Sequence, residues 1–142
     1  MIIGDGLIGG RFSALSHDGV LIFASGVSNS KSSCSEDYAR EISLVKKALT
    51  KYKGHLFIYF STYSIDDPDL RDTHYVLHKQ KVEEIISNSG GSYLIIRTSN
   101  IVGRNLYNPH TVLNFLYTKI KNEEAFECWS NAERNLLDID HL

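Results

Sequence analysis

Short continuous apolar runs alternate along the chain with amphipathic helical patterns. The apolar runs occupy residues 1–3, 20–25, 55–62 and 92–100, and they are rich in β-branched and aromatic side chains. Continuous runs of this kind are typical of strands that are covered on both faces. The alternation predicts an α/β fold with a parallel sheet flanked by helices.

The spacing of apolar residues predicts three longer helices. The first covers residues 38–49, and its apolar stripe consists of Tyr38, Ile42, Val45 and Leu49. Ser33 followed by Glu36 predicts a capping box at its start. The second helix covers residues 75–87. The third is expected to begin at Asn108 and Pro109, with the asparagine as N-cap and the proline as first helical residue.

Length and charge exclude several classes of protein. The 142 residues suffice for one domain, residues 1–142, and the net charge of −2 with scattered Lys and Arg provides no stripe for a phosphate backbone. No apolar run reaches membrane-spanning length, and "MIIGDG" lacks a signal-peptide pattern. The two cysteines are not in a metal-type spacing, which fits a reduced, cytoplasmic chain. We therefore expect neither nucleic acid nor a membrane as partner.

The start of the chain carries Gly4-x-Gly6-x-x-Gly9 directly after an apolar run. Glycines in this spacing permit a tight turn, the approach of a pyrophosphate to the backbone, and close packing of a helix on a strand. The alternative is a glycine-rich strand–helix turn without a ligand. An acidic residue is expected about 20 residues further on, after a second strand. Only Asp18 is near, in a turn, so a dinucleotide site here would have a reduced adenosine half.

A lysine lies on the apolar face of the helix over residues 75–87. At a helical period this face consists of Tyr75, Lys79, Val82 and Ile86. Charged side chains avoid such positions unless they are paired or used. Tyr75 and Lys79 are one turn apart, about 6 Å along the axis, so the ammonium is expected to lower the phenol pKa and make Tyr75 an acid–base group. The alternative is a half-buried Tyr75 with Lys79 extending to water.

Three further polar residues have ordinary structural interpretations. His74 and His78 have a spacing that suits a metal, but no third ligand is in view, so we interpret them as ordinary polar residues and expect no metal site. Arg97 lies inside a strand and is expected to pair with a carboxylate.

Six stretches carry motifs that occur in a fixed order over most of the chain. They read GDGLIGG, LIFASGVSNS, FIYFSTYSI, HYVLHKQKVEE, LIIRTSNIVGRN and AERNLLDIDHL. In this order they resemble the extended short-chain dehydrogenase/reductase family, which comprises nucleotide-sugar epimerases, dehydratases and reductases. The family places its nucleotide loop in the first stretch, its catalytic Ser or Thr in the third and its Tyr-x-x-x-Lys pair in the fourth. The resemblance implies a Rossmann-like fold.

The resemblance also implies an activity, which is hydride transfer between a sugar carbon of a nucleotide-sugar and NAD or NADP. It implies catalytic roles for Thr62, Tyr75 and Lys79, cofactor contacts for Gly4, Gly6, Gly9, Ser25 and Lys79, and substrate contacts for Asn100 and Arg134. Alternatives remain open for the last two residues. Asn100 is also suited to cap a turn, and Arg134 to form a surface ion pair with Glu133 or Asp138.

Four departures from the family pattern leave two hypotheses open. The second and third strands of the family fold are missing, and the loop from Thr62 to Tyr75 is short. The family's helix asparagine is replaced by Glu41 or Asp37. The sequence stops at Leu142, with the substrate-binding part incomplete. The chain is either an active enzyme or a non-catalytic nucleotide-binding or assembly subunit that keeps the fold. The missing strands would leave the first strand at a sheet edge, which predicts a homodimer.

Overall fold

The computed structural model describes residues 1–15, 17–103, 111–128 and 130–142. The chain divides into two compact units, Met1–Thr98 and Ser99–Leu142, and each is described by itself. The expectation of one domain over residues 1–142 stays a prediction.

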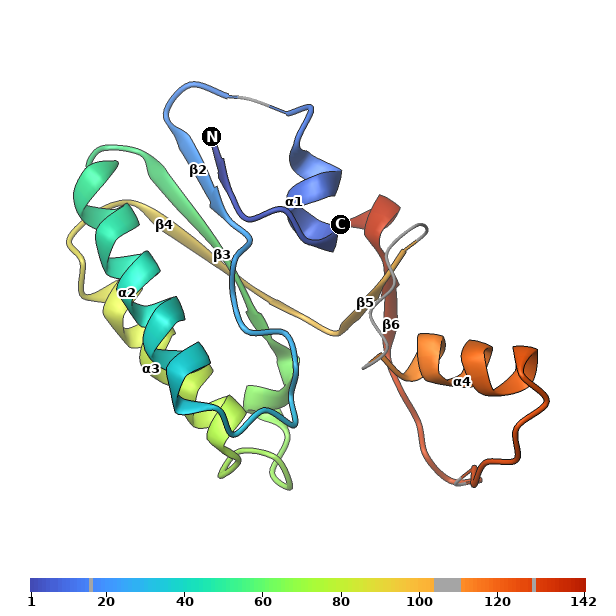
Figure 1. Cartoon of the computed structure of the whole chain (residues 1–142). Coiled ribbons are helices and arrows are strands. Elements are labelled where there is room, and N and C mark those ends of the chain that lie inside the picture. Colours follow the sequence, from blue (N-terminus) through green and yellow to red (C-terminus); the bar gives the residue numbers. More distant parts are fainter. Residues whose placement is uncertain (16, 104–110, 129) are drawn as a thin grey trace. The chain divides into compact units, whose positions relative to one another are not determined.

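The first unit is built on a four-stranded parallel sheet with the order β1-β2-β3-β4 (Figure 1). Its strands are β1 (Ile2–Ile3), β2 (Val20–Phe23), β3 (Leu56–Thr62) and β4 (Tyr93–Thr98). Between them lie α1 (Leu7–Phe12), α2 (Ser35–Lys51), the 3-10 helix η1 (Tyr63–Asp66) and α3 (His74–Ser87). The predicted α/β fold with a parallel sheet flanked by helices is confirmed.

Strand β1 lies at the edge of this sheet. Its neighbour is β2, with Ile2 in register with Ile22, and within the described residues no strand lies beyond it. This arrangement agrees with the expected loss of the second and third family strands. The homodimer inferred from the open edge stays a prediction.

Helices α2 and α3 lie side by side on one face of the sheet and form the core with it (Figure 1). The buried core residues are Leu21, Phe23, Val45, Ala48, Phe57, Tyr59, Val82 and Ile86. The rings of Phe23 and Phe57 stack with centroids 5.8 Å apart. Because burial of one such side chain stabilises a fold by roughly 1.5–3 kcal/mol, this cluster fixes both helices on the sheet.

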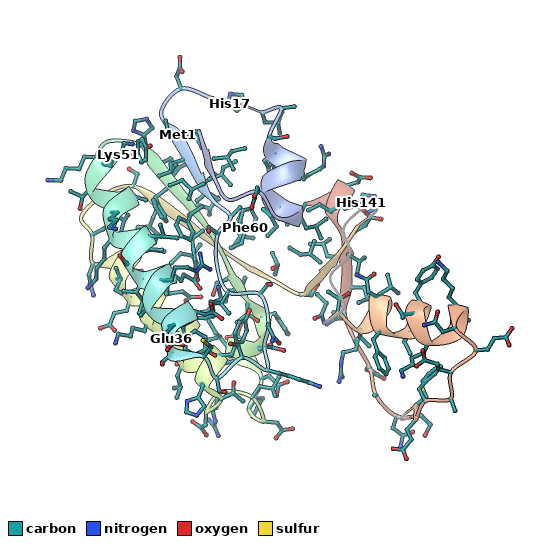
Figure 2. The ribbon with its side chains drawn as sticks, in the orientation of Figure 1. Met1, His17, Glu36, Lys51, Phe60 and His141 are labelled. Atoms are coloured by element: carbon teal, nitrogen blue, oxygen red, sulfur yellow. The ribbon has the colours of Figure 1, made fainter. Side chains whose placement is uncertain are left out.

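The opposite face of the sheet carries α1. The ring of Phe12 stacks on that of Phe60, which Figure 2 labels, with centroids 6.0 Å apart. Leu94, on the same face of β4, is 45% exposed. The apolar runs were expected to be covered on both faces, and on this face the cover is partial.

The helices of the first unit begin differently from each other. Helix α2 begins at Ser35 after Cys34, which makes no capping side-chain bond, so the predicted capping box at Ser33 is wrong. Acidic residues of its first turn, including Glu36 (Figure 2), instead suit the positive end of the helix dipole. Helix α3 is capped by Thr73, whose side chain accepts a hydrogen bond from the Val76 amide.

The second unit contains β5 (Asn100–Val102), α4 (Val112–Lys121), β6 (Leu136–Asp138) and the 3-10 helix η2 (Ile139–His141). Strands β5 and β6 pair in parallel. The predicted helix start at Asn108 and Pro109 lies outside the described residues, and α4 is capped by Thr111. In the part of the chain that the structure describes, no helix has the length and apolar character needed to cross a membrane.

Candidate functional site

The predicted site residues of the first unit lie where the parallel strands end. Strand β1 leads into Gly4, β2 leads into Ser25, and β3 ends at Thr62. The carboxyl ends of parallel strands lie at the same edge of a sheet, where open α/β folds bind their ligands. The fold therefore places these predicted residues at one edge.

Thr62 and Tyr75 are neighbours at the end of β3. Both side chains are buried, and the nearby Thr62 hydroxyl favours the ionised form of Tyr75. The Thr62 oxygen also accepts a bond from the Ser64 amide at 3.2 Å, which fixes its orientation. The structure thus brings together two residues separated by the short loop that follows β3.

Lys79 lies inside the protein and does not extend to water. It is 2% exposed, which rules out the alternative of a lysine that reaches the solvent. Its Nζ atom donates to Glu41 Oε1 at 3.0 Å and to the Tyr59 hydroxyl at 3.0 Å. It also lies 5.7 Å from the ring centroid of Tyr75.

The pKa of Tyr75 changes in the direction opposite to the one expected. Burial raises it to about 12 and outweighs the opposing hydrogen bond from Thr62, and the negative charge of Glu41 raises it further. The expectation that Lys79 lowers this pKa is wrong because the lysine ammonium is paired with Glu41. In this state Tyr75 is a neutral phenol at pH 7.

Glu41 is the buried centre of the site, although its sequence context predicts only that it replaces the family's helix asparagine. It is fully buried and accepts hydrogen bonds from the Val27 amide at 2.7 Å, the Tyr59 hydroxyl at 2.6 Å, His78 Nε2 at 2.9 Å and Lys79 Nζ at 3.0 Å. Burial acts to raise its pKa, but the bond from His78, the charge of Lys79 and the other two bonds outweigh it and lower the pKa to about 2. Glu41 is therefore ionised at neutral pH.

A sequence signal for Glu41 existed. Glu41, Val45 and Ala48 form the buried face of α2, whereas the expected stripe ran through Tyr38, Ile42, Val45 and Leu49. A glutamate one turn before Val45 on an apolar face needs a buried cation.

The two histidines of α3 have different surroundings. His74 is exposed, whereas His78 is buried and stacks on the Tyr38 ring at 4.3 Å between centroids. Among the described residues, no group of three or more His, Cys, Asp or Glu side chains is placed to hold a metal ion.

The glycines of the first turn have distinct roles. Gly4 has φ +112°, and a Cβ there would lie 2.4 Å from the Ala24 carbonyl oxygen. A Cβ at Gly9 would lie 2.2 Å from the carbonyl oxygen of Gly4. Only glycine permits this close packing of the turn against β2. A Cβ at Gly6 would meet no described atom within 4 Å, so packing against the described residues does not require glycine at this position. These roles fit the dinucleotide pattern, although the packing alone also explains two of the three glycines.

An open pocket of about 310 Å³ lies beside this turn. It is lined by Met1, Ile2, Gly4, Asp5, Gly9, Gly10, Ser13 and Leu15. Its lining includes two of the predicted cofactor glycines but neither Tyr75 nor Lys79. The candidate catalytic site is therefore defined by the surroundings of Tyr75 and not by this pocket.

Ser25 and Arg97 interact with charged side chains. Ser25 is half-buried, and its hydroxyl accepts a long hydrogen bond of 3.4 Å from Arg40. Arg97 pairs with Glu83 at 2.8 Å and with Asp66 at 3.0 Å, which confirms its predicted structural role.

Asn100 and Arg134 both lie in the second unit. The Asn100 side chain donates to the Asn135 carbonyl at 3.4 Å, and Arg134 donates to the carbonyl of Glu133 at 2.7 Å. Each residue thus has a backbone partner within the second unit. Their proposed contacts with a substrate stay predictions.

Comparison with known proteins gives one structural likeness. No protein-family model matches the chain, and no curated protein matches it. The chain is similar to the crystal structure of the capsular polysaccharide assembling protein CapF from Staphylococcus aureus, with a TM-score of 0.60, 16% sequence identity and 94% of this chain covered. The chain spans 35% of the length of that protein. At this identity the likeness supports the fold alone.

Proposed function

We propose that the chain has a reduced form of the extended short-chain dehydrogenase/reductase fold, without the family's second and third strands, and that it transfers hydride between a nucleotide-sugar and NAD or NADP. The observation that carries the proposal is the contact between Thr62 and Tyr75 at the end of β3, with Lys79 one turn further along α3. A lone Tyr-x-x-x-Lys spacing is common, whereas a buried Tyr75 with the Thr62 hydroxyl near it is a more specific arrangement.

In this proposal each side chain has a defined task. Thr62 hydrogen-bonds the reacting oxygen of the sugar, and Tyr75 transfers the proton. Because burial keeps Tyr75 a neutral phenol, it is set to donate a proton to a carbonyl oxygen, as the reductive step of such a reaction requires. Tyr75 takes the proton back in the oxidative direction.

Four glycine and serine positions and one lysine would hold the cofactor, which supplies the hydride acceptor or donor. They are Gly4, Gly6, Gly9, Ser25 and Lys79. The close packing at Gly4 and Gly9 in the turn after β1 supports this assignment. Lys79 adds one N–H, because its contacts within the described residues use two of the three. We propose Asn100 and Arg134 as substrate contacts, since the guanidinium suits a diphosphate.

Cofactor titration and one substitution test the enzyme. We expect NAD(H) or NADP(H) to bind at millimolar concentration or below, measured by calorimetry. With a panel of nucleoside diphosphate sugars, Tyr75→Phe should abolish turnover and leave cofactor affinity nearly unchanged, whereas Lys79→Ala should weaken both. Absence of cofactor binding, or an unchanged rate in Tyr75→Phe, would contradict the proposal.

A second candidate function is a non-catalytic nucleotide-binding or assembly subunit. The pairing of Lys79 with Glu41 favours this second function. The ammonium keeps its charge, but the charge is balanced by the carboxylate and does not activate Tyr75. The structural likeness to a capsular polysaccharide assembling protein agrees with it as well. Cofactor or nucleotide binding without turnover would favour this second function.

A further inference from the structure

The carboxylate of Glu41 uses its whole hydrogen-bonding capacity inside the protein. Oε1 accepts from Tyr59 and Lys79, and Oε2 accepts from His78 and the Val27 amide. An ionised carboxylate offers about four acceptor positions, and all are filled. Glu41 therefore has no position for a ligand, and any influence it has on one passes through its partners.

We propose that Glu41 is a positioning residue of the Tyr75–Lys79 site, which holds the buried Lys79 ammonium charged and fixed and also anchors the loop that follows β2. The role of the site rests on the proposed function. The contacts that carry the inference do not involve a ligand.

Lys79 needs a carboxylate to remain charged. Burial lowers its pKa, and the charge and hydrogen bond of Glu41 act in the opposite direction. A buried ammonium without a partner would release its proton, because the neutral amine is the form that tolerates an apolar interior. Removal of the Glu41 charge therefore favours the neutral form of Lys79.

Glu41 also fixes the direction of the ammonium. With two donors held by Glu41 and Tyr59, Nζ lies 5.1 Å from the Tyr59 ring centroid and 5.7 Å from that of Tyr75. The titratable groups that face Lys79 are Glu41 from α2, Tyr59 from β3, and Tyr75 and Glu83 from α3, with His78 in contact through Glu41. Of the two carboxylates, only Glu41 bonds the ammonium directly.

The same carboxylate shapes the loop beside Ser25. It accepts the Val27 amide, and a Cβ at Gly26 would lie 2.8 Å from Lys79 Nζ and 2.9 Å from Glu41 Oε1. The loop backbone thus packs directly on the ion pair. Glu41 of α2 therefore fixes the position of the Lys79 ammonium and also that of the loop beside Ser25, a proposed cofactor contact.

The titration of Lys79 tests the inference in protein without cofactor or substrate. Lysine labelled with ¹³C at Cε is followed by NMR from pH 6 to pH 12, and the Lys79 signal is assigned by its loss in Lys79→Arg. We expect the signal to titrate at lower pH in Glu41→Gln than in the wild type. Glu83→Gln is the matched control, because it removes a nearby carboxylate that does not bond the ammonium, and it should move the titration much less.

The outcomes separate this inference from the proposed function. An identical Lys79 titration in the wild type and in Glu41→Gln would overturn the positioning role, since a merely structural glutamate changes stability without moving that titration. Failure of NAD(H) and NADP(H) to bind would remove the proposed function and leave the titration result standing.

A second variant covers the case in which Glu41→Gln does not fold. Glu41→Gln combined with Lys79→Met removes both charges, so it should be more stable than Glu41→Gln alone. A double variant that is no more stable than the single one would show that the lysine charge is not what Glu41 holds.

Discussion

Acid should destabilise the protein through one buried carboxylate, that of Glu41. The hydrogen bonds and the charge of Lys79 lower its pKa from 4.5 to about 2 in the folded state, against the opposing effect of burial. A carboxylate with a depressed pKa stabilises the folded state above its ordinary pKa, and this contribution is lost as the pH falls through the folded value. The loss therefore falls between about pH 5 and pH 2.

The difference between the folded and unfolded pKa values sets the contribution of Glu41 to the free energy of unfolding. At about 1.4 kcal/mol per pH unit, this contribution is about 3 kcal/mol at pH 7, and about 2 kcal/mol of it is lost by pH 3. This loss is a large part of the free energy of unfolding of a small domain, which is roughly 5–15 kcal/mol.

Urea unfolding followed by circular dichroism at pH 7, 5, 4 and 3 measures this effect. The free energy of unfolding of the wild type should exceed that of Glu41→Gln at pH 7, and the difference should shrink by about 2 kcal/mol at pH 3. The other carboxylates are shared by both proteins, so their contributions cancel.

A carboxylate on the surface provides the control. Hydrogen bonds from Lys119 and Asn122 lower the pKa of Glu124, but this group is in solvent, where ion pairs contribute little. Glu124→Gln should keep the acid sensitivity of the wild type. A difference between wild type and Glu41→Gln that stays constant from pH 7 to pH 3 would refute the reasoning.

Four further substitutions have defined effects on the urea midpoint. Gly26→Ala places a Cβ 2.8 Å from the buried ammonium and should cost about 1–3 kcal/mol. Gly10→Ala, in open space on a helix, should instead stabilise the protein by about 0.5–1 kcal/mol, so equal midpoints for these two would contradict the packing of the loop. Leu21→Ala in the core should cost about 2–5 kcal/mol, and a loss below about 1 kcal/mol would mean that this core is not formed. Thr73→Ala removes the cap of α3 and should cost about 1 kcal/mol; an unchanged midpoint would show that the cap does not contribute.

The strands could be predicted because each is a local apolar run that ends in turn residues. The runs at 20–25 and 55–62 correspond to Val20–Phe23 and Leu56–Thr62. The run at 92–100 instead splits into β4 and β5, because Asn100 is in register with Leu136 of the second unit. A partner so distant in sequence leaves no mark in a local pattern.

The candidate site could be predicted in part. Thr62 and Tyr75 meet because a strand end and the start of the next helix are close in a parallel fold. The protonation of Tyr75 could not be predicted, since burial dominates its pKa and the charge of Glu41 adds to it, and Glu41 is distant from Tyr75 in the sequence. Helical periodicity alone placed Glu41 beside the apolar stripe and not within it.

The bond between the Val27 amide and Glu41 has a consequence for hydrogen exchange. Val27 lies outside the helices and strands, yet its N–H is held at 2.7 Å by a fully buried carboxylate. We expect that proton to exchange slowly, because the carboxylate that accepts it is also bonded to side chains of β3 and α3. The Val27 amide should therefore show the slow exchange of a central strand, and it is a native reporter of how cooperatively the first unit opens.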